Sequence, residues 1–248
     1  MCIVGRPRAC WIDRSNASMS AGPLAMRFAE ATLEQPEAGS LMTAHLVVEN
    51  TGTIPWTSRV LASYHWLDGL GNPIVWDGLR TPLGRDVAPG EAATIEMTVR
   101  GPIPPGRYRF AADLVVEWRA WFSELGSTAA SFDVDVAPRS TPTHYELPAA
   151  LTPSADWQER TAAAHAEGYS VVAGAIDWPQ RLLHRRPRAL EQYRPGKGRV
   201  PGFPAPLICP SVVDGVELER LPDIAGLPAY AAPTNEPWIY DGRITLLA

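Results

Sequence analysis

The sequence is poor in the residues on which covalent and metal frameworks depend. Only three of its 248 residues are cysteine, namely Cys2, Cys10 and Cys209, so at most one disulfide bond can form. None of them belongs to a Cys-x-x-Cys pair typical of zinc or redox sites. No run of about 20 apolar residues predicts a membrane span, and residues 1–23 lack the apolar stretch of a secretory signal. We therefore expect a cytoplasmic protein without a disulfide scaffold.

Motifs for catalysis or nucleotide binding are also scarce. Residues 168–172 (GYSVV) end in valine where a nucleophile elbow requires glycine. Residues 196–199 (GKGR) lack the earlier glycine and the Ser or Thr of a phosphate-binding loop. Asp133 and Asp135 form a DxD pair, but alternate residues of a strand share its outer face, so we interpret them as solvated acids. The five histidines have no metal-ligand spacing. We expect no catalytic residues, no metal and no cofactor, which favours a protein that is not an enzyme.

Proline and tryptophan, by contrast, are abundant. The sequence has 25 prolines and nine tryptophans, and the proline content is about twice the average share of roughly 5%. Because proline interrupts helices, long helices are not expected. Hydrophobic residues make up 46% and charged residues 20%, which is typical of a globular protein with a sizeable core.

The chain divides into segments of different character. Residues 138–143 (PRSTPT) combine proline with hydroxyl residues, as extended linkers do. We predict a disordered lead over residues 1–23, a β-rich domain over residues 24–138, and a smaller proline-rich α/β extension over residues 139–248.

The β-rich domain shows the two-residue alternation of half-buried strands. Leu41 to Asn50, Glu91 to Arg100 and Arg107 to Glu117 each place apolar side chains on one face and polar ones on the other. Shorter segments bring the number to about seven strands, the number and spacing of an immunoglobulin-like antiparallel sandwich. These further segments are Met26–Leu33, Arg59–Leu67, Pro73–Trp76 and Phe132–Val136.

Several motifs of this domain resemble known families. Residues 47–52 (VVENTG) followed by Trp56, then residues 88–91 (APGE) and 105–108 (PGRY), resemble the Ig-like four-tryptophan domain of autophagy cargo receptors and its bacterial relatives. The outline is also similar to the carbohydrate-binding sandwich of polysaccharide-exporting ABC transporter ATPases. Residues 64–66, 76–81 and 121–122 resemble Ig-like modules attached to bacterial glycan-assembly enzymes. These resemblances imply an Ig-like fold and a glycan or polysaccharide as partner.

The alternation also predicts a candidate site. If Tyr64 and Trp66 face the core, then His65 faces outward on the same sheet as Arg109 and Asp113. Acids, arginine and aromatic rings are suited to binding sugar hydroxyls and apolar sugar faces, so we predict a glycan surface on this side. A solvated sheet face without a ligand is the alternative, and one β-bulge would reverse the assignment. The candidate ligand-binding residues are His65, Arg109, Asp113, Glu117, Trp118 and Trp121.

The pattern of residues 139–248 predicts one helix and one or two strands. Thr152 and Pro153 predict a helix start, with its end at Glu167 before Gly168, and Tyr169 to Ile176 predicts a buried strand. Residues 181–199 are rich in basic side chains, so they are interpreted either as a solvated loop or as a contact for an anionic partner. From Pro201 onward we expect an extended strap with irregular backbone contacts and bound water.

Together these features predict a non-catalytic carbohydrate-binding or glycan-assembly accessory protein. A glycosyltransferase or another protein is expected as a possible partner, whereas nucleic acid is not. Two alternatives stay open: a protein-interaction scaffold, and a glycosyltransferase fragment that uses a nucleotide-sugar.

Overall fold

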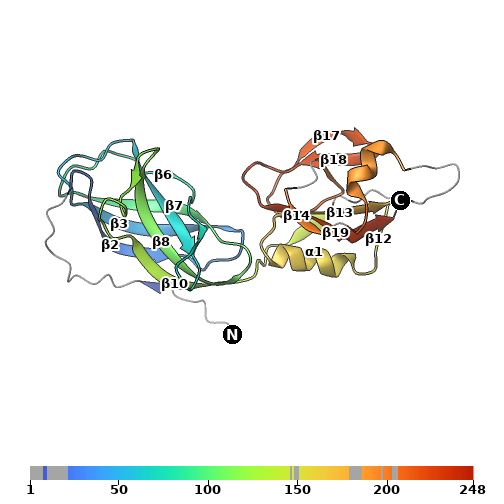
Figure 1. The fold of residues 1–248 in the computed structure, drawn as a ribbon, viewed down its shortest axis with the longest axis horizontal. Coiled ribbons are helices and arrows are strands. Elements are labelled where there is room, and N and C mark those ends of the chain that lie inside the picture. The colour runs from blue at the N-terminus through green and yellow to red at the C-terminus, as the bar shows by residue number, and fades with distance from the viewer. Residues whose placement is uncertain are drawn as a thin grey trace. The chain divides into compact units, whose positions relative to one another are not determined.

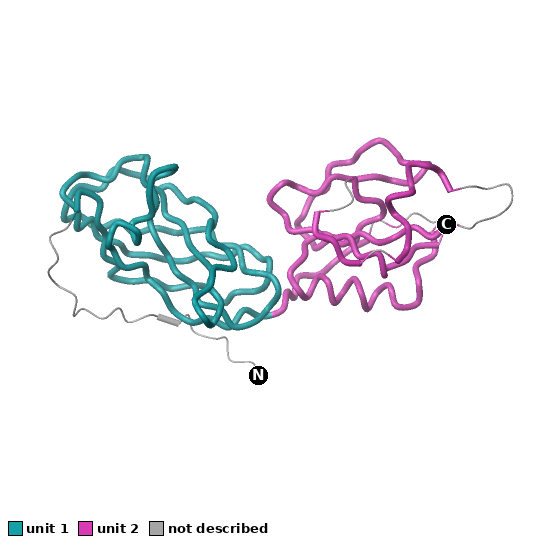
Figure 2. The backbone as a smooth tube through the Cα atoms, in the orientation of Figure 1, with its two compact units in different colours: residues 1–137 teal, residues 138–248 magenta. Residues whose placement is uncertain are grey.

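The chain folds into two compact units, residues 1–137 and 138–248 (Figure 2). The computed structural model describes residues 22–145, 147, 151–178, 186–196, 198–202 and 206–247, and the backbone of residues 8–9. Most of the predicted N-terminal lead, residues 1–23, therefore lies outside the described residues. Each unit is considered by itself below.

Unit 1 is a sandwich of two antiparallel sheets (Figure 1). One sheet has the order β1-β2-β3-β7 and the other β10-β8-β4-β5, with β6 beside β4 and β9 beside β8. The strands are β1 (Arg8–Ala9), β2 (Met26–Leu33), β3 (Leu41–Asn50), β4 (Val60–Leu67), β5 (Pro73–Val75), β6 (Thr81–Pro82), β7 (Ala92–Arg100), β8 (Gly106–Val116), β9 (Ala120–Trp121) and β10 (Ala130–Val136).

The core of unit 1 has the hallmarks of an immunoglobulin-like sandwich. Trp66 of β4 is fully buried, and its Nε1–H donates a hydrogen bond to the carbonyl oxygen of Arg100 at 2.9 Å. Tyr108, near the start of β8, donates its hydroxyl hydrogen to the carbonyl oxygen of Pro104 at 2.7 Å. A buried tryptophan on a central strand and such a tyrosine corner are typical of this fold. The predicted fold class, a mainly β protein with an Ig-like sandwich, is confirmed.

Unit 2 is a mixed sheet with one helix against it (Figure 1). The larger sheet has the order β11-β16-β13-β19-β12, with β14 beside β19, and a smaller sheet has the order β15-β18-β17. The elements are β11 (Thr143–Tyr145), β12 (Thr152–Pro153), α1 (Trp157–Ala166), β13 (Val171–Asp177), the 3₁₀ helix η1 (Arg188–Tyr193), β14 (Arg199–Pro201), β15 (Leu207–Ile208), β16 (Ser211–Val213), β17 (Glu219–Ile224), β18 (Leu227–Ala231) and β19 (Trp238–Leu247).

The helix of unit 2 begins later than predicted. Thr152 and Pro153 pair with Leu247 and Leu246 of β19, so they form a short strand, and α1 starts only at Trp157. Tertiary pairing outweighs the local preference of proline for a first helical turn. The predicted strand over Tyr169 to Ile176 is present as β13. Among the described residues, no helix combines the length and the apolar character needed to cross a membrane.

The C-terminal part is not the irregular strap that we predicted from its proline content. It forms strands β15 to β19, and β19 pairs with β13 in parallel, with a register shift after Gly174. Sheet pairing satisfies the backbone groups that the prediction assigned to irregular contacts and water. Within the predicted basic segment, residues 181–185 and Lys197 lie outside the described residues.

Candidate functional site

The outer face of β4 and β8 is covered rather than open. His65 and Asp113 point away from the sandwich core, as the alternation predicted, yet both are buried, with 3% and 0% of their surface exposed. The ring of Trp76 stacks on His65 at 4.1 Å between centroids, and Trp121 packs edge-on at 4.3 Å. The predicted open glycan surface is therefore wrong at His65, Asp113 and Trp121, because the side chains of Trp76, just after β5, and Trp121, in β9, form a second layer over the sheet.

His65 and Asp113 attach the covering segments around Trp76 and Ser123 to the sheet. The Nδ1 of His65 lies against the carbonyl oxygen of Trp76, and since a carbonyl only accepts, Nδ1 carries the proton. The Nε2 of His65 lies 3.7 Å from a carboxylate oxygen of Asp113. That carboxylate accepts hydrogen bonds from the backbone N–H groups of Leu114 at 2.7 Å and Ser123 at 3.3 Å. The two residues hold the covering layer in place and do not face solvent.

Arg80 closes the same layer from its edge. Its Nη1 donates to Ser63 Oγ at 2.9 Å and its Nη2 to Asp77 Oδ1 at 2.9 Å, while its Nε donates to Glu117. The guanidinium also lies over the ring of Trp121, 4.9 Å from the centroid. Arg80 thereby positions Glu117, which begins the turn over residues 117–119 between β8 and β9.

Trp118 stands at that turn, fully exposed to solvent. Its φ of +60° is in the left-handed region, and the turn is closed by the N–H of Arg119, which donates to the carbonyl oxygen of Val116 at 3.0 Å. Bulky residues rarely adopt this conformation, which suits glycine or asparagine.

Arg109 lies far from this turn. Its Nε donates to Asp133 of β10 at 3.0 Å, and the guanidinium groups of Arg109 and Arg107 hold the pKa of Asp133 below its usual range. Arg109 and Val116 are separated by most of β8, which corresponds to about 23 Å at roughly 3.3 Å per residue. The six predicted site residues are thus divided between a buried layer, an exposed turn and a distant ion pair.

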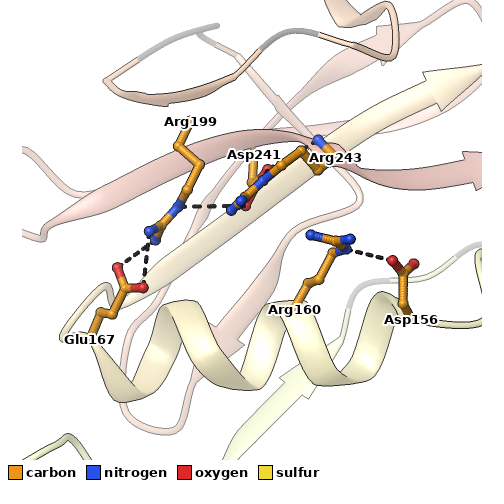
Figure 3. Close-up of polar contacts among 6 residues, drawn as sticks. All are labelled: Asp156, Arg160, Glu167, Arg199, Asp241 and Arg243. Atoms are coloured by element: carbon orange, nitrogen blue, oxygen red, sulfur yellow. Dashed lines mark hydrogen bonds and ion pairs between the residues drawn. The ribbon is translucent and has the colours of Figure 1, made fainter.

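A cleft that the sequence did not predict lies in unit 2. It has a volume of about 290 Å³ and lies between α1 and the strands β14 and β19. Figure 3 shows the guanidinium groups of Arg160, Arg199 and Arg243 on the same side of α1, each beside a carboxylate.

Asp241 is the buried anchor of this cleft, with 1% of its surface exposed. Its carboxylate accepts hydrogen bonds from the backbone N–H of Arg243 at 3.0 Å and from the Nε and Nη2 of the same residue at 2.8 and 2.6 Å. Arg199 Nε lies 3.5 Å from Oδ2. Burial alone would raise the pKa of Asp241. The hydrogen bonds from Arg243 and the positive charges of Arg243 and Arg199 outweigh burial and lower this pKa, so the carboxylate is ionised.

Two further ion pairs complete the cleft. Arg199 donates from Nη1 and Nη2 to the two carboxylate oxygens of Glu167 at 2.9 and 2.6 Å, a bidentate pair (Figure 3). Arg160 donates from Nε to Asp156 Oδ2 at 2.5 Å. The sequence contains one indication of this cleft, because the charged residues at positions 156, 160 and 167 share one helical face. The contributions of β14 and β19 depend on strand pairing that no local pattern predicts.

Unit 2 also contains a buried histidine next to a serine. His165 Nδ1 lies 2.8 Å from the carbonyl oxygen of Tyr169, so Nδ1 carries the proton and Nε2 accepts the hydroxyl hydrogen of Ser211 at 2.7 Å. Burial lowers the pKa of His165 to about 4, helped by the nearby charge of Arg139. Both side chains are almost completely buried, so this pair stabilises the fold and has no access to a substrate. In the described part of the chain, no group of three or more His, Cys, Asp or Glu side chains is arranged to hold a metal ion.

These features define a mainly β protein with an Ig-like sandwich and a second mixed unit. A scan against protein-family models and a search of curated proteins found no match. Among solved structures, the chain is similar to the CARDB domain of a Pyrococcus furiosus protein in complex with di-metal ions. The two are 18% identical with a TM-score of 0.30, and the match covers 51% of this chain and 99% of that domain. It is also similar to the C-terminal domain of wzt, at 8% identity, 54% coverage of this chain, 80% of that chain and a TM-score of 0.34.

Proposed function

We propose that unit 1 is a non-catalytic carbohydrate-binding module that binds a glycan at the Trp118 turn. The observation that carries this proposal is the indole of Trp118, which is fully exposed on a residue with a left-handed backbone conformation. A glycan-assembly setting and a glycosyltransferase partner remain predictions from the sequence resemblance.

The Trp118 turn is unfavourable for stability on two counts. A tryptophan side chain has 150–250 Å² of surface whose burial would be favourable, and a left-handed non-glycine residue costs on the order of 1–3 kcal/mol. Strain of this kind is concentrated at functional sites. An exposed flat ring is suited to stacking on the apolar face of a sugar ring. The neighbouring Glu117 and Arg119 offer an acceptor and donors for sugar hydroxyls.

The buried layer supports this turn rather than touching the ligand. Arg80 holds Glu117, and Trp121 begins to pack against the sheet three residues after Trp118. His65 in turn supports the ring of Trp121. Of the predicted site residues, we propose glycan contact for Trp118 and Glu117 and a positioning role for His65, Asp113 and Trp121.

Replacing Trp118 by alanine should weaken glycan binding at least about tenfold, because truncation of a central aromatic contact typically costs 1.4 kcal/mol or more. Glycan arrays probed with the full chain identify the ligand, and protection of tryptophan fluorescence from acrylamide quenching then gives the affinity. Leu70→Ala is the matched control, since Leu70 is also highly exposed on a hairpin of unit 1. Equal binding by wild type and Trp118→Ala would overturn the proposal.

Trp118→Gly separates binding from stability. Glycine adopts the left-handed conformation without strain, so the free energy of unfolding should rise by about 1 kcal/mol while glycan binding is lost. Urea denaturation measures the first effect and the quenching assay the second. A lower stability with unchanged binding would show that Trp118 has a structural role instead.

A further inference from the structure

We propose that the cleft between α1 and the strands β14 and β19 of unit 2 is a second binding site, and that it takes a neutral, hydroxyl-rich ligand of about the size of one sugar ring. The proposal rests on the geometry of unit 2 alone and does not depend on the role of Trp118.

The cleft presents hydrogen-bond donors that the protein itself leaves available. Of the guanidinium of Arg160, only Nε is hydrogen-bonded to a described residue, which leaves the four N–H groups of Nη1 and Nη2. Arg243 uses Nε and Nη2 for Asp241, which leaves Nη1 without a bond within the described part of the chain. The cleft also presents an acceptor, the carboxylate of Glu159. This side chain has no ion-pair or hydrogen-bond partner among the described residues.

The charge balance of the lining decides which ligand class fits. Arg160, Arg199 and Arg243 stand against four carboxylates, those of Asp156, Glu159, Glu167 and Asp241. An anionic ligand would therefore enter a lining with one more negative than positive group, and its charge would be repelled rather than stabilised. A cationic ligand brings hydrogen-bond donors and no acceptor, so the free N–H groups of Arg160 and Arg243 would stay without a partner. A hydroxyl group both donates and accepts, so a polyol can use the carboxylates and the guanidinium groups together.

The lining is also held in a fixed arrangement before any ligand arrives. Asp241 is buried and binds Arg243 in a bidentate manner, and Glu167 does the same for Arg199 (Figure 3). Such preorganisation reduces the entropy lost on binding. The volume of about 290 Å³ is at the lower end of the roughly 300–1,000 Å³ of small-molecule sites, which limits the ligand to about one ring.

The test is an NMR titration of the full chain, observed at the arginine Nε–H signals and the backbone amides of α1, β14 and β19. The neutral probes are glucose, galactose, mannose and N-acetylglucosamine, and the charged counterparts are glucuronate and glucose 6-phosphate. We expect at least one neutral sugar to shift the cleft signals with a Kd on the order of 1 mM, and the charged counterparts to bind more weakly.

Arg160→Gln should weaken that binding at least about tenfold, and Glu159→Gln should weaken it as well, since both side chains offer ligand contacts and neither is buried. Arg194→Gln is the matched control, because Arg194 forms a similar exposed ion pair with Glu191 in unit 2 but does not line the cleft. Trp118→Ala should leave the cleft shifts unchanged, which separates this site from the proposed glycan site of unit 1. Tighter binding of the charged counterparts, no response to any neutral sugar, or full binding by Arg160→Gln would overturn the proposal.

Discussion

Replacing Trp66 by alanine should lower the free energy of unfolding of unit 1 by about 3–5 kcal/mol. The indole is completely buried between the two sheets, and its ring contacts Phe110 at 5.1 Å and Tyr108 at 6.3 Å between centroids. Truncation to alanine leaves a cavity that the surrounding strands cannot fill, and it removes the hydrogen bond from Nε1 to the carbonyl oxygen of Arg100. Urea denaturation of the full chain, with hydrogen exchange of the β4 and β8 amides, measures the loss in unit 1.

Two variants make this result specific. Trp66→Phe keeps most of the packing and loses the hydrogen bond, so we expect an intermediate loss of about 1–2 kcal/mol. Trp118→Ala removes the same side chain from an exposed position and should cost almost nothing. A similar loss for Trp66→Ala and Trp118→Ala would contradict the assignment of Trp66 to the core.

Lowering the pH from 7 to 4 should remove about 3 kcal/mol from the stability of unit 2. In the folded chain the pKa of His165 is lowered from 6.5 to about 4, chiefly by burial and also by Arg139. Between these values the unfolded chain takes up a proton and the folded chain does not. Stability is therefore complete above about pH 6.5 and is lost as the pH falls toward 4. Each pKa unit corresponds to about 1.36 kcal/mol, which gives the magnitude.

Hydrogen exchange of the β13 amides, corrected for the intrinsic pH dependence, reports this loss within unit 2. His165→Gln removes the titrating group, so its stability should vary much less between pH 6.5 and 4. His144→Gln is the control, because His144 is exposed on β11 and its replacement leaves the buried pair of His165 and Ser211 intact. An unchanged pH dependence in His165→Gln would show that another group is responsible.

The strands of unit 1 follow closely from the sequence. The alternation over Leu41 to Asn50 and over Glu91 to Arg100 predicts β3 and β7 to within a residue, and it places Trp66 in the core. Both results depend on a two-residue period and on turn residues, which are local properties of the chain.

The environment of the outward-facing residues did not follow from the same pattern. Alternation shows which side of a sheet His65 faces, but it carries no information about the segments that fold over that side. Trp76 follows β5 and Trp121 belongs to the short strand β9, and their rings cover His65, which the alternation alone had placed on an open surface. Trp118 was predicted as a site residue, yet only its backbone conformation and exposure distinguish it from Trp121.

In unit 2 the sequence determined the helix and the buried strand after it, while tertiary structure decided how the other strands pair and which side chains line the cleft. Residues of β19 lie far along the chain from their partners in β12 and β13, so strand pairing alone brings Asp241 and Arg243 to the face of α1 that carries Arg160 and Glu167. The sequence by itself determined the Ig-like class, the strand pattern of unit 1 and its tryptophan core, because these rest on short-range periodicity. Only the tertiary structure decided which polar residues are buried, that Trp118 is fully exposed and where a cleft exists, because those depend on contacts between distant segments.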